Sequence, residues 1–164
     1  MIPHRVHNFG TYFITAPSFE HRTIFQNTRL AELMIETLLR YRSQQKYLLH
    51  QFVVMPDHLH TILTPIEITL ERAVQLIKGG FSHSARQDGF GNLEIRQRGY
   101  SDHRIRDTND YDVHVAYIRM NPVRAGLCAR PEEYAFSSAT ERFTLDGTPP
   151  RLKPEPELAG VRHG

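Results

Sequence analysis

Two histidines separated by a single residue are the groups in this sequence best suited to chemistry. In His58-Leu59-His60 the imidazoles are two positions apart, and on a β-strand that spacing places both side chains on the same face. Two imidazoles so placed can share one divalent cation. The alternative is two polar residues on a half-exposed strand. A complete site would need a third ligand and a reactive group.

A segment about sixty residues further along the chain offers candidates for both. Tyr117 and Asn121 are four residues apart, which places them one turn apart on one face of a helix. The apolar seam of this helix is expected on a neighbouring stripe, at Val113, Ala116 and Met120. Taken alone, the helix is better explained by a partly buried tyrosine and an asparagine that ends the helix before a proline.

The elements that must position these groups alternate between strand and helix patterns. Runs of β-branched and aromatic residues predict strands at 11–16, 47–54 and 58–63, with a fourth around 93–98. Apolar residues at helical spacing predict helices at 28–42, from Leu70 to Gly79-Gly80 or weakly beyond, and from Asp107 or Asp110 to a stop or kink at Asn121-Pro122.

The resulting order, βαββαβ plus a further helix, predicts an α+β fold. We expect a ferredoxin-like (split βαβ) antiparallel sheet with helices on one face, and a C-terminal helix that carries the tyrosine. Residues 8–145 are expected to form this single domain. Residues 146–164 are rich in Pro and Gly and are expected to form an extended tail.

Composition excludes several classes of protein. The 164 residues leave no room for an ATPase module, and we find no Gly-rich phosphate loop. The single cysteine, Cys128, cannot form an internal disulfide or a thiolate-rich zinc site, which favours a reducing compartment and nitrogen or oxygen ligands. No apolar run approaches the ~20 residues that span a bilayer or has the character of a signal peptide. We therefore expect a cytoplasmic protein without a membrane partner.

Basic residues concentrate in one stretch although the whole chain carries a net charge of only +2. Residues 72–106 hold seven basic and three acidic side chains, together with aromatic residues that could stack on unpaired bases. A charged run is usually a solvated face, and His103 and His114 are expected in surface or capping roles. The candidate DNA contacts are Arg96, Arg98, Tyr100, Arg104, Arg106, Arg119 and Arg124.

Together these motifs resemble those of a known family. The segments Val54-Met55-Pro56-Asp57-His58-Leu59-His60 and Tyr117-Ile118-Arg119-Met120-Asn121-Pro122 are similar to those of the single-tyrosine HUH transposases of the insertion-sequence-200-like kind. The similarity is closest to the branch called REP-associated tyrosine transposases and covers about residues 10–140. Relatives often carry tryptophan before the basic strand and at the position of Phe136, and this chain has none.

The resemblance implies a role for each site residue. It implies that His58 and His60 are metal ligands, that Tyr117 is the nucleophile and that Asn121 completes the metal site. The implied cofactor is a divalent metal, magnesium or manganese. The implied activity is nicking and rejoining of single-stranded, hairpin-forming DNA through a covalent 5′-phosphotyrosine, with palindromic repeats as the substrate and a monomer or homodimer as the acting form.

Two other functions remain open at this point. A protein of the same fold could recognise palindromic repeats without catalysis. A metal-dependent phosphodiesterase could use the two histidines and a water molecule as nucleophile, without the tyrosine.

Overall fold

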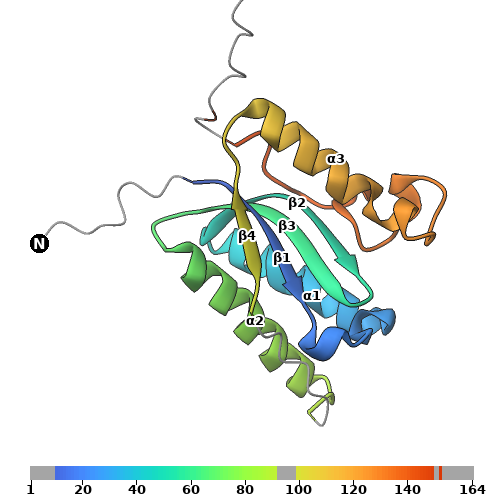
Figure 1. Ribbon diagram of the computed structural model, residues 1–164. Coiled ribbons are helices and arrows are strands. Elements are labelled where there is room, and N and C mark those ends of the chain that lie inside the picture. Colours follow the sequence, from blue (N-terminus) through green and yellow to red (C-terminus); the bar gives the residue numbers. More distant parts are fainter. Residues whose placement is uncertain (1–9, 92–98, 150–151, 153–164) are drawn as a thin grey trace, which may run out of the picture.

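A four-stranded antiparallel sheet forms the centre of the molecule (Figure 1). The computed structural model describes residues 10–91, 99–149 and 152. The strands are β1 (Tyr12–Pro17), β2 (Tyr47–Met55), β3 (His58–Pro65) and β4 (Ser101–Arg104). They lie in the order β2-β3-β1-β4, with antiparallel pairing throughout. The α+β fold class and the ferredoxin-like strand order are therefore confirmed.

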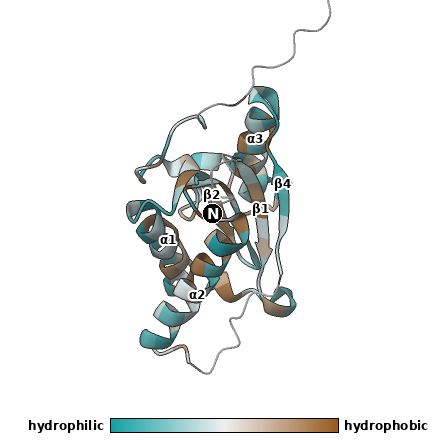
Figure 2. Cartoon of the chain, turned by 90° about the vertical axis from the view of Figure 1, so that its left-hand side faces the viewer, coloured by the Kyte–Doolittle hydropathy of each residue, from teal (hydrophilic) through white to brown (hydrophobic). Residues whose placement is uncertain are grey.

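Two helices cover one face of the sheet. The N-terminus of α1 (Thr28–Ser43) is capped by Asn27, and that of α2 (Leu70–Gln87) by Thr69. Their apolar sides turn toward the sheet, as Figure 2 shows, and pack with the β3 residues Leu59 and Leu63. None of the helices in the described ranges is long and apolar enough to cross a membrane.

The sequence predicts that α2 ends at Gly79-Gly80 or continues beyond them, and the helix continues. The helix passes through Gly79 and Gly80 and continues to Gln87. A Cβ at Gly80 would lie 2.7 Å from the Tyr41 hydroxyl oxygen of α1, so the glycine permits the two helices to approach closely. Here glycine serves helix packing rather than helix termination.

The third helix, α3 (Thr108–Arg124), lies on the opposite face of the sheet (Figure 1). Its N-terminus is capped by Asp107, whose carboxylate accepts a hydrogen bond from the Asp110 N–H at 2.8 Å. Its core contacts form a second cluster, in which Tyr111 and Ile118 pack with Val53, Met55 and Ile62 of the sheet.

The end and the apolar seam of α3 both differ from the sequence prediction. Of the predicted stop or kink at Asn121-Pro122, the stop does not occur, because the helix continues through Pro122 to Arg124. The proline removes one helical hydrogen bond, and the burial of its ring offsets part of that loss. The expected seam is also misplaced, because Val113 and Met120 are 55% and 36% exposed. The residues that face the sheet are Tyr111, Ile118 and Pro122.

The fourth strand differs in position from the sequence prediction. The predicted segment, 93–98, lies outside the described residues, and the strand that pairs with β1 is Ser101–Arg104. This strand reads Ser-Asp-His-Arg and so lacks an apolar run. It is an edge strand, and charged side chains there discourage pairing with another chain.

Contacts of the fold extend into the start of the predicted tail. The Asp146 carboxylate accepts hydrogen bonds from Arg42 Nε and from the Leu49 N–H, both at 2.9 Å. The Gly147 carbonyl oxygen lies 2.6 Å from Nδ1 of His50. Ordered contacts therefore reach Gly147, beyond the boundary predicted at residue 145.

Candidate active site

His58 and His60 lie on the face of β3 that is turned toward α3. Ile62, two residues further along, belongs to the cluster with α3, whereas Leu59 and Leu63 pack with α1 and α2. The predicted alternation of faces is therefore confirmed. The two imidazole ring centroids are 4.5 Å apart.

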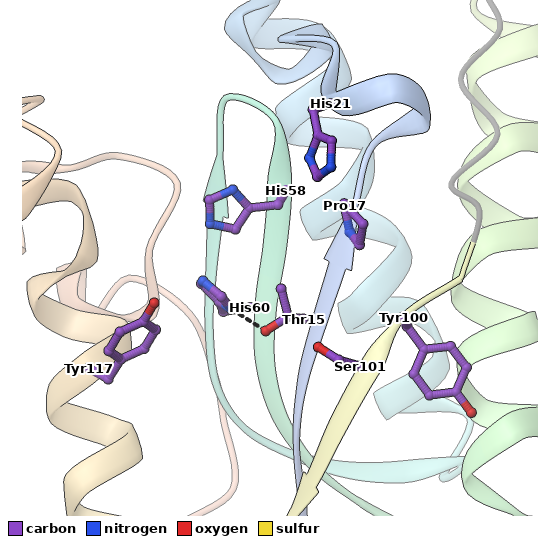
Figure 3. A pocket seen from close by; sticks show the side chains of 8 residues that line it. All are labelled: Thr15, Pro17, His21, His58, His60, Tyr100, Ser101 and Tyr117. Atoms are coloured by element: carbon purple, nitrogen blue, oxygen red, sulfur yellow. Dashed lines mark hydrogen bonds between the residues drawn. The ribbon is translucent and has the colours of Figure 1, made fainter.

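A pocket of about 510 Å³ opens beside this pair of histidines (Figure 3). The Tyr117 side chain of α3 lines it, and its ring centroid is 5.3 Å from that of His60. Figure 3 shows the Tyr117 hydroxyl pointing toward the two imidazoles. The structure thus brings together three of the four predicted site residues. The pocket is lined by Thr15, Pro17, His21, His58, His60, Tyr100, Ser101 and Tyr117.

Hydrogen bonds fix both imidazoles through the same ring nitrogen. Nδ1 of His60 is 2.9 Å from the Thr15 hydroxyl oxygen, and Nδ1 of His58 is 2.6 Å from a carboxylate oxygen of Asp57. Metal-binding histidines commonly use one nitrogen in this way and leave the other for the ion. The arrangement therefore leaves Nε2 of each ring for a ligand.

Burial keeps His60 in the form that a metal requires. The residue is only 4% exposed, and burial, together with the neighbouring His58, lowers the pKa of His60 to about 3. The imidazole is therefore neutral at pH 7, and the neutral ring is the metal-binding form. Two imidazoles beside a carboxylate form a donor set that fits a divalent ion.

Tyr117 is held from two sides. Phe13 of β1 contacts its ring edge to face at 5.8 Å, and the Arg124 guanidinium carbon lies 5.7 Å from the ring centroid. Asn121 lies one turn further along α3, is half-buried and is not one of the residues that line the pocket. Its role as a ligand stays a prediction.

The predicted DNA-contacting residues have different positions. Tyr100 lines the pocket, and its ring centroid is 5.5 Å from Nζ of Lys78. Arg104 and Arg106 are exposed at the end of β4 and just beyond it, and on α3 Arg119 is half-buried and Arg124 exposed. Arg96 and Arg98 lie outside the described residues.

Comparisons with known proteins point to the same family as the motifs. No family model matches the chain. A REP-associated tyrosine transposase of Escherichia coli (strain K12) is 28% identical over 131 residues, which cover 79% of this chain and 76% of that protein. The chain is a homologue of that transposase. A solved structure of a REP-associated tyrosine transposase bound to a REP hairpin has the same fold, with a TM-score of 0.69, 24% identity and coverage of 94% of this chain and 98% of that chain.

One pocket residue of this transposase homologue, His21, had no signal in the sequence. It follows β1 in a short turn, where Glu20 and His21 both have positive φ, 53° and 54°. The turn is tied to the β2–β3 hairpin, because the Ser18 N–H and hydroxyl both donate to the Asp57 carbonyl oxygen at 2.9 Å. A contact between segments far apart in the chain produces no periodic pattern in the sequence. Only the polar residues after Pro17 indicate that a turn follows β1.

A second histidine cluster lies across Phe13 from the first. The sequence predicts surface or capping roles for His103 and His114, whereas the structure places a ligand atom of each within 4.8 Å of the other and of Asp110. These three side chains could hold a metal ion. The Phe13 ring centroid is 5.3 Å from that of His60 and 4.8 Å from that of His114, so this one ring separates the two clusters.

Proposed function

We propose that the chain is a metal-dependent tyrosine transposase that nicks and rejoins single-stranded, hairpin-forming DNA. The observation that carries this proposal is the position of Tyr117, whose hydroxyl faces the pocket lined by His58 and His60. The homologous transposase of Escherichia coli supports the enzyme class, and the structural relative bound to a REP hairpin supports a hairpin substrate. A cytoplasmic location and action as a monomer or homodimer stay predictions.

A divalent metal, magnesium or manganese in preference, would be held by Nε2 of His58 and of His60. Asn121 is the predicted third ligand, and phosphate oxygens of the DNA would supply others. When bound, the ion would neutralise charge on the scissile phosphate and stabilise the departing 3′ oxygen. Asp57 and Thr15 would orient the two rings through their Nδ1 atoms.

Tyr117 would act as the nucleophile. Its hydroxyl would lose its proton to water as the oxygen attacks the phosphorus. The bond from phosphorus to the 3′ oxygen would break, that oxygen would take up a proton, and a 5′-phosphotyrosine would form. Tyrosine is protonated at neutral pH, and the positive charge of Arg124 beside the ring would favour negative charge on the attacking oxygen. The ester conserves the phosphoester bond for later attack by a DNA 3′ hydroxyl, so no nucleotide cofactor is needed.

His21 is the candidate for proton exchange with the departing 3′ oxygen. It lines the same pocket as Tyr117 but comes from the turn after β1 rather than from α3. In-line displacement requires attacking and leaving oxygens on opposite sides of the phosphorus. An imidazole on the side away from the nucleophile is therefore suited to give a proton to the leaving oxygen and to remove it during rejoining.

The remaining pocket wall would hold the substrate strand. Tyr100 offers an aromatic face for an unpaired base, next to the ammonium group of Lys78. Arg104, Arg106, Arg119 and Arg124 are proposed to contact backbone phosphates. Arg96 and Arg98 stay predicted members of this surface.

A covalent-adduct assay tests the function directly. A labelled single-stranded hairpin oligonucleotide is incubated with the protein and Mg²⁺ or Mn²⁺, and an SDS-resistant protein–DNA adduct is expected. Tyr117→Phe should abolish the adduct, whereas Tyr100→Phe, in the same pocket, should retain it. An adduct that persists in Tyr117→Phe would show that the nucleophile is another residue.

The same assay separates the other two functions. Cleavage without an adduct would support a metal-dependent phosphodiesterase in which water attacks. Tight hairpin binding without cleavage, in either metal, would support a non-catalytic protein that recognises palindromic repeats.

A further inference from the structure

We propose that His103, Asp110 and His114 form a second metal site, which binds a late first-row transition ion such as Zn²⁺ and fastens α3 to β4. The site is distinct from the one proposed at His58 and His60. It does not depend on the proposed function, because its ligands come from the edge strand and from the first half of the tyrosine-bearing helix.

The geometry of the three side chains carries the proposal. Nε2 of His103 is 2.8 Å and Nδ1 of His114 is 3.1 Å from carboxylate oxygens of Asp110. The two imidazole rings are stacked, with centroids 4.6 Å apart and planes inclined by 18°. Three ligand atoms within 4.8 Å of one another are near enough to bind one ion once the imidazole rings turn toward it, since ligand bonds to zinc are about 2.0–2.2 Å long.

The donor set selects the class of metal. Two imidazole nitrogens and one carboxylate oxygen suit zinc, cobalt or nickel, whereas magnesium prefers oxygen ligands and retains much of its water. Three protein ligands leave at least one position for a water molecule. The exposed side-chain fractions, 35% for His103, 19% for Asp110 and 20% for His114, leave a path for the ion and for that water.

The surroundings already orient these ligands. The Arg106 N–H donates to the Asp110 carboxylate at 2.9 Å, and Phe13 packs against the ring of His114. Partial burial alone would raise the pKa of Asp110, but the hydrogen bonds from Arg106 and His103 lower it overall. The carboxylate is therefore ionised, as a metal ligand must be.

Metal binding would change two hydrogen bonds. The bond between His103 and Asp110 would be replaced by bonds from both to the ion, and Nδ1 of His114 would give up its 2.8 Å hydrogen bond to the Asp110 carbonyl oxygen. Each imidazole would bind in its neutral form and carry its remaining proton on the other ring nitrogen. No oxidation or covalent step is involved.

The position of this site gives it a structural purpose. Asp110 and His114 lie on α3 ahead of Tyr117, and His103 lies on β4 two residues after Ser101, which lines the pocket. Few other contacts in the described residues join β4 to α3. An ion here would fix the two elements that supply opposite walls of the pocket, as structural zinc sites do in small domains.

A cobalt titration distinguishes a metal site from a hydrogen-bonded cluster. Metal-free protein carrying His58→Ala and His60→Ala, which removes the first pair, is titrated with Co²⁺ and followed by visible absorption. We expect one equivalent to bind with d–d bands of low-symmetry, tetrahedral-like coordination, and Zn²⁺ to displace it. Absence of saturable Co²⁺ or Zn²⁺ binding in this variant would overturn the proposal.

Conservative variants identify the ligands. In the same background, His103→Gln and His114→Gln keep hydrogen-bonding ability but are poor ligands, and each should weaken Zn²⁺ binding by more than about 100-fold. His83→Gln, at an exposed histidine of α2, should leave it unchanged. Equal Zn²⁺ affinity in the three variants would show that the ion binds elsewhere and would refute the assignment.

Thermal unfolding supplies a readout that does not depend on spectroscopy. In the His58→Ala/His60→Ala background, Zn²⁺ should raise the Tm of the protein with and without His83→Gln, because it binds the folded state alone. It should not raise the Tm when His114→Gln is added to that background. An increase of the same size in all three proteins would contradict the fastening role.

Discussion

One pair of histidines lies on each side of Phe13. The two pairs differ in which ring nitrogens their hydrogen-bond partners leave available. His58 and His60 come from one strand, and an oxygen holds Nδ1 of each ring, so Nε2 is left for the pocket that contains Tyr117, the proposed nucleophile. His103 and His114 come from different elements and converge on one carboxylate, that of Asp110. We therefore propose that the first pair meets the substrate and that the second joins β4 to α3.

The largest expected difference is in the rate of adduct formation. The His58→Ala/His60→Ala double variant should form the hairpin adduct more slowly by a factor on the order of 10³, since the charge on the phosphate is no longer neutralised. The His103→Gln/His114→Gln double variant should lose at most about tenfold through poorer positioning of Tyr117. Single-turnover kinetics at saturating DNA measure both, with hairpin affinity as the control. Equal losses would remove the functional distinction between the pairs.

A second comparison concerns His21 and the step that it would assist. His21→Ala should slow adduct formation by on the order of 10²-fold, because the departing 3′ oxygen loses its proton donor. An oligonucleotide with sulfur in place of that 3′ oxygen has a leaving group that needs no proton, and it should react almost equally with both proteins. His83→Ala serves as the control. Persistence of the full defect with the sulfur substrate would refute the proton-transfer role.

Phe13 is the side chain that both pairs share. Phe13→Ala should lower the free energy of unfolding by about 2–3 kcal/mol, less than for a fully buried ring, since Phe13 is only half-buried. Urea denaturation measures the loss, and Phe13→Leu, which keeps most of the apolar volume, should recover more than half of it. A loss below about 0.5 kcal/mol would show that Phe13 contributes little to the packing between the two clusters.

The sequence predicted the first pair and could not predict the second. His58 and His60 are two residues apart on one strand, so local periodicity places them on one face, and the spacing of Tyr117 and Asn121 does the same for a helix. The meeting of His103 with His114 depends on pairing between β1 and β4. That strand has no apolar run, and it was expected at 93–98 instead.

The sequence also predicts the wrong face of α3 as the buried one, for a related reason. Val113, Ala116 and Met120 are the apolar residues at helical spacing, yet the sheet packs against Tyr111, Ile118 and Pro122. A helix with apolar residues on more than one side has no single preferred face in its sequence. Tertiary packing makes the choice, and it leaves Tyr117 exposed at the pocket.

A smaller effect is expected at Arg124. Its guanidinium lies beside the Tyr117 ring, and a cation at an exposed aromatic contributes about 0.5–1 kcal/mol. Arg124→Ala should therefore slow adduct formation by about threefold to fivefold, with Arg124→Lys closer to the wild type. Arg142→Ala, which removes a guanidinium beside Phe143 and away from the pocket residues, should have no effect. A defect confined to DNA affinity would reassign Arg124 to phosphate contact alone.

The smallest expected effect is the pH dependence of stability that arises from Asp110. Hydrogen bonds from Arg106 and His103 outweigh the effect of partial burial and lower its pKa in the folded protein. At acidic pH the unfolded chain takes up this proton more readily than the folded one, so Asp110 stabilises the fold above about pH 4 and loses that contribution as the pH falls through its folded pKa. With a chelator present to exclude metal, the Tm advantage of the wild type over Asp110→Asn should shrink by at most about 3 °C between neutral and acidic pH.

The shrinkage should persist in the His58→Ala/His60→Ala background, because the carboxylate acts within the second cluster. If it vanished there, the two histidine pairs would be one electrostatic unit, and the separation by Phe13 would not hold.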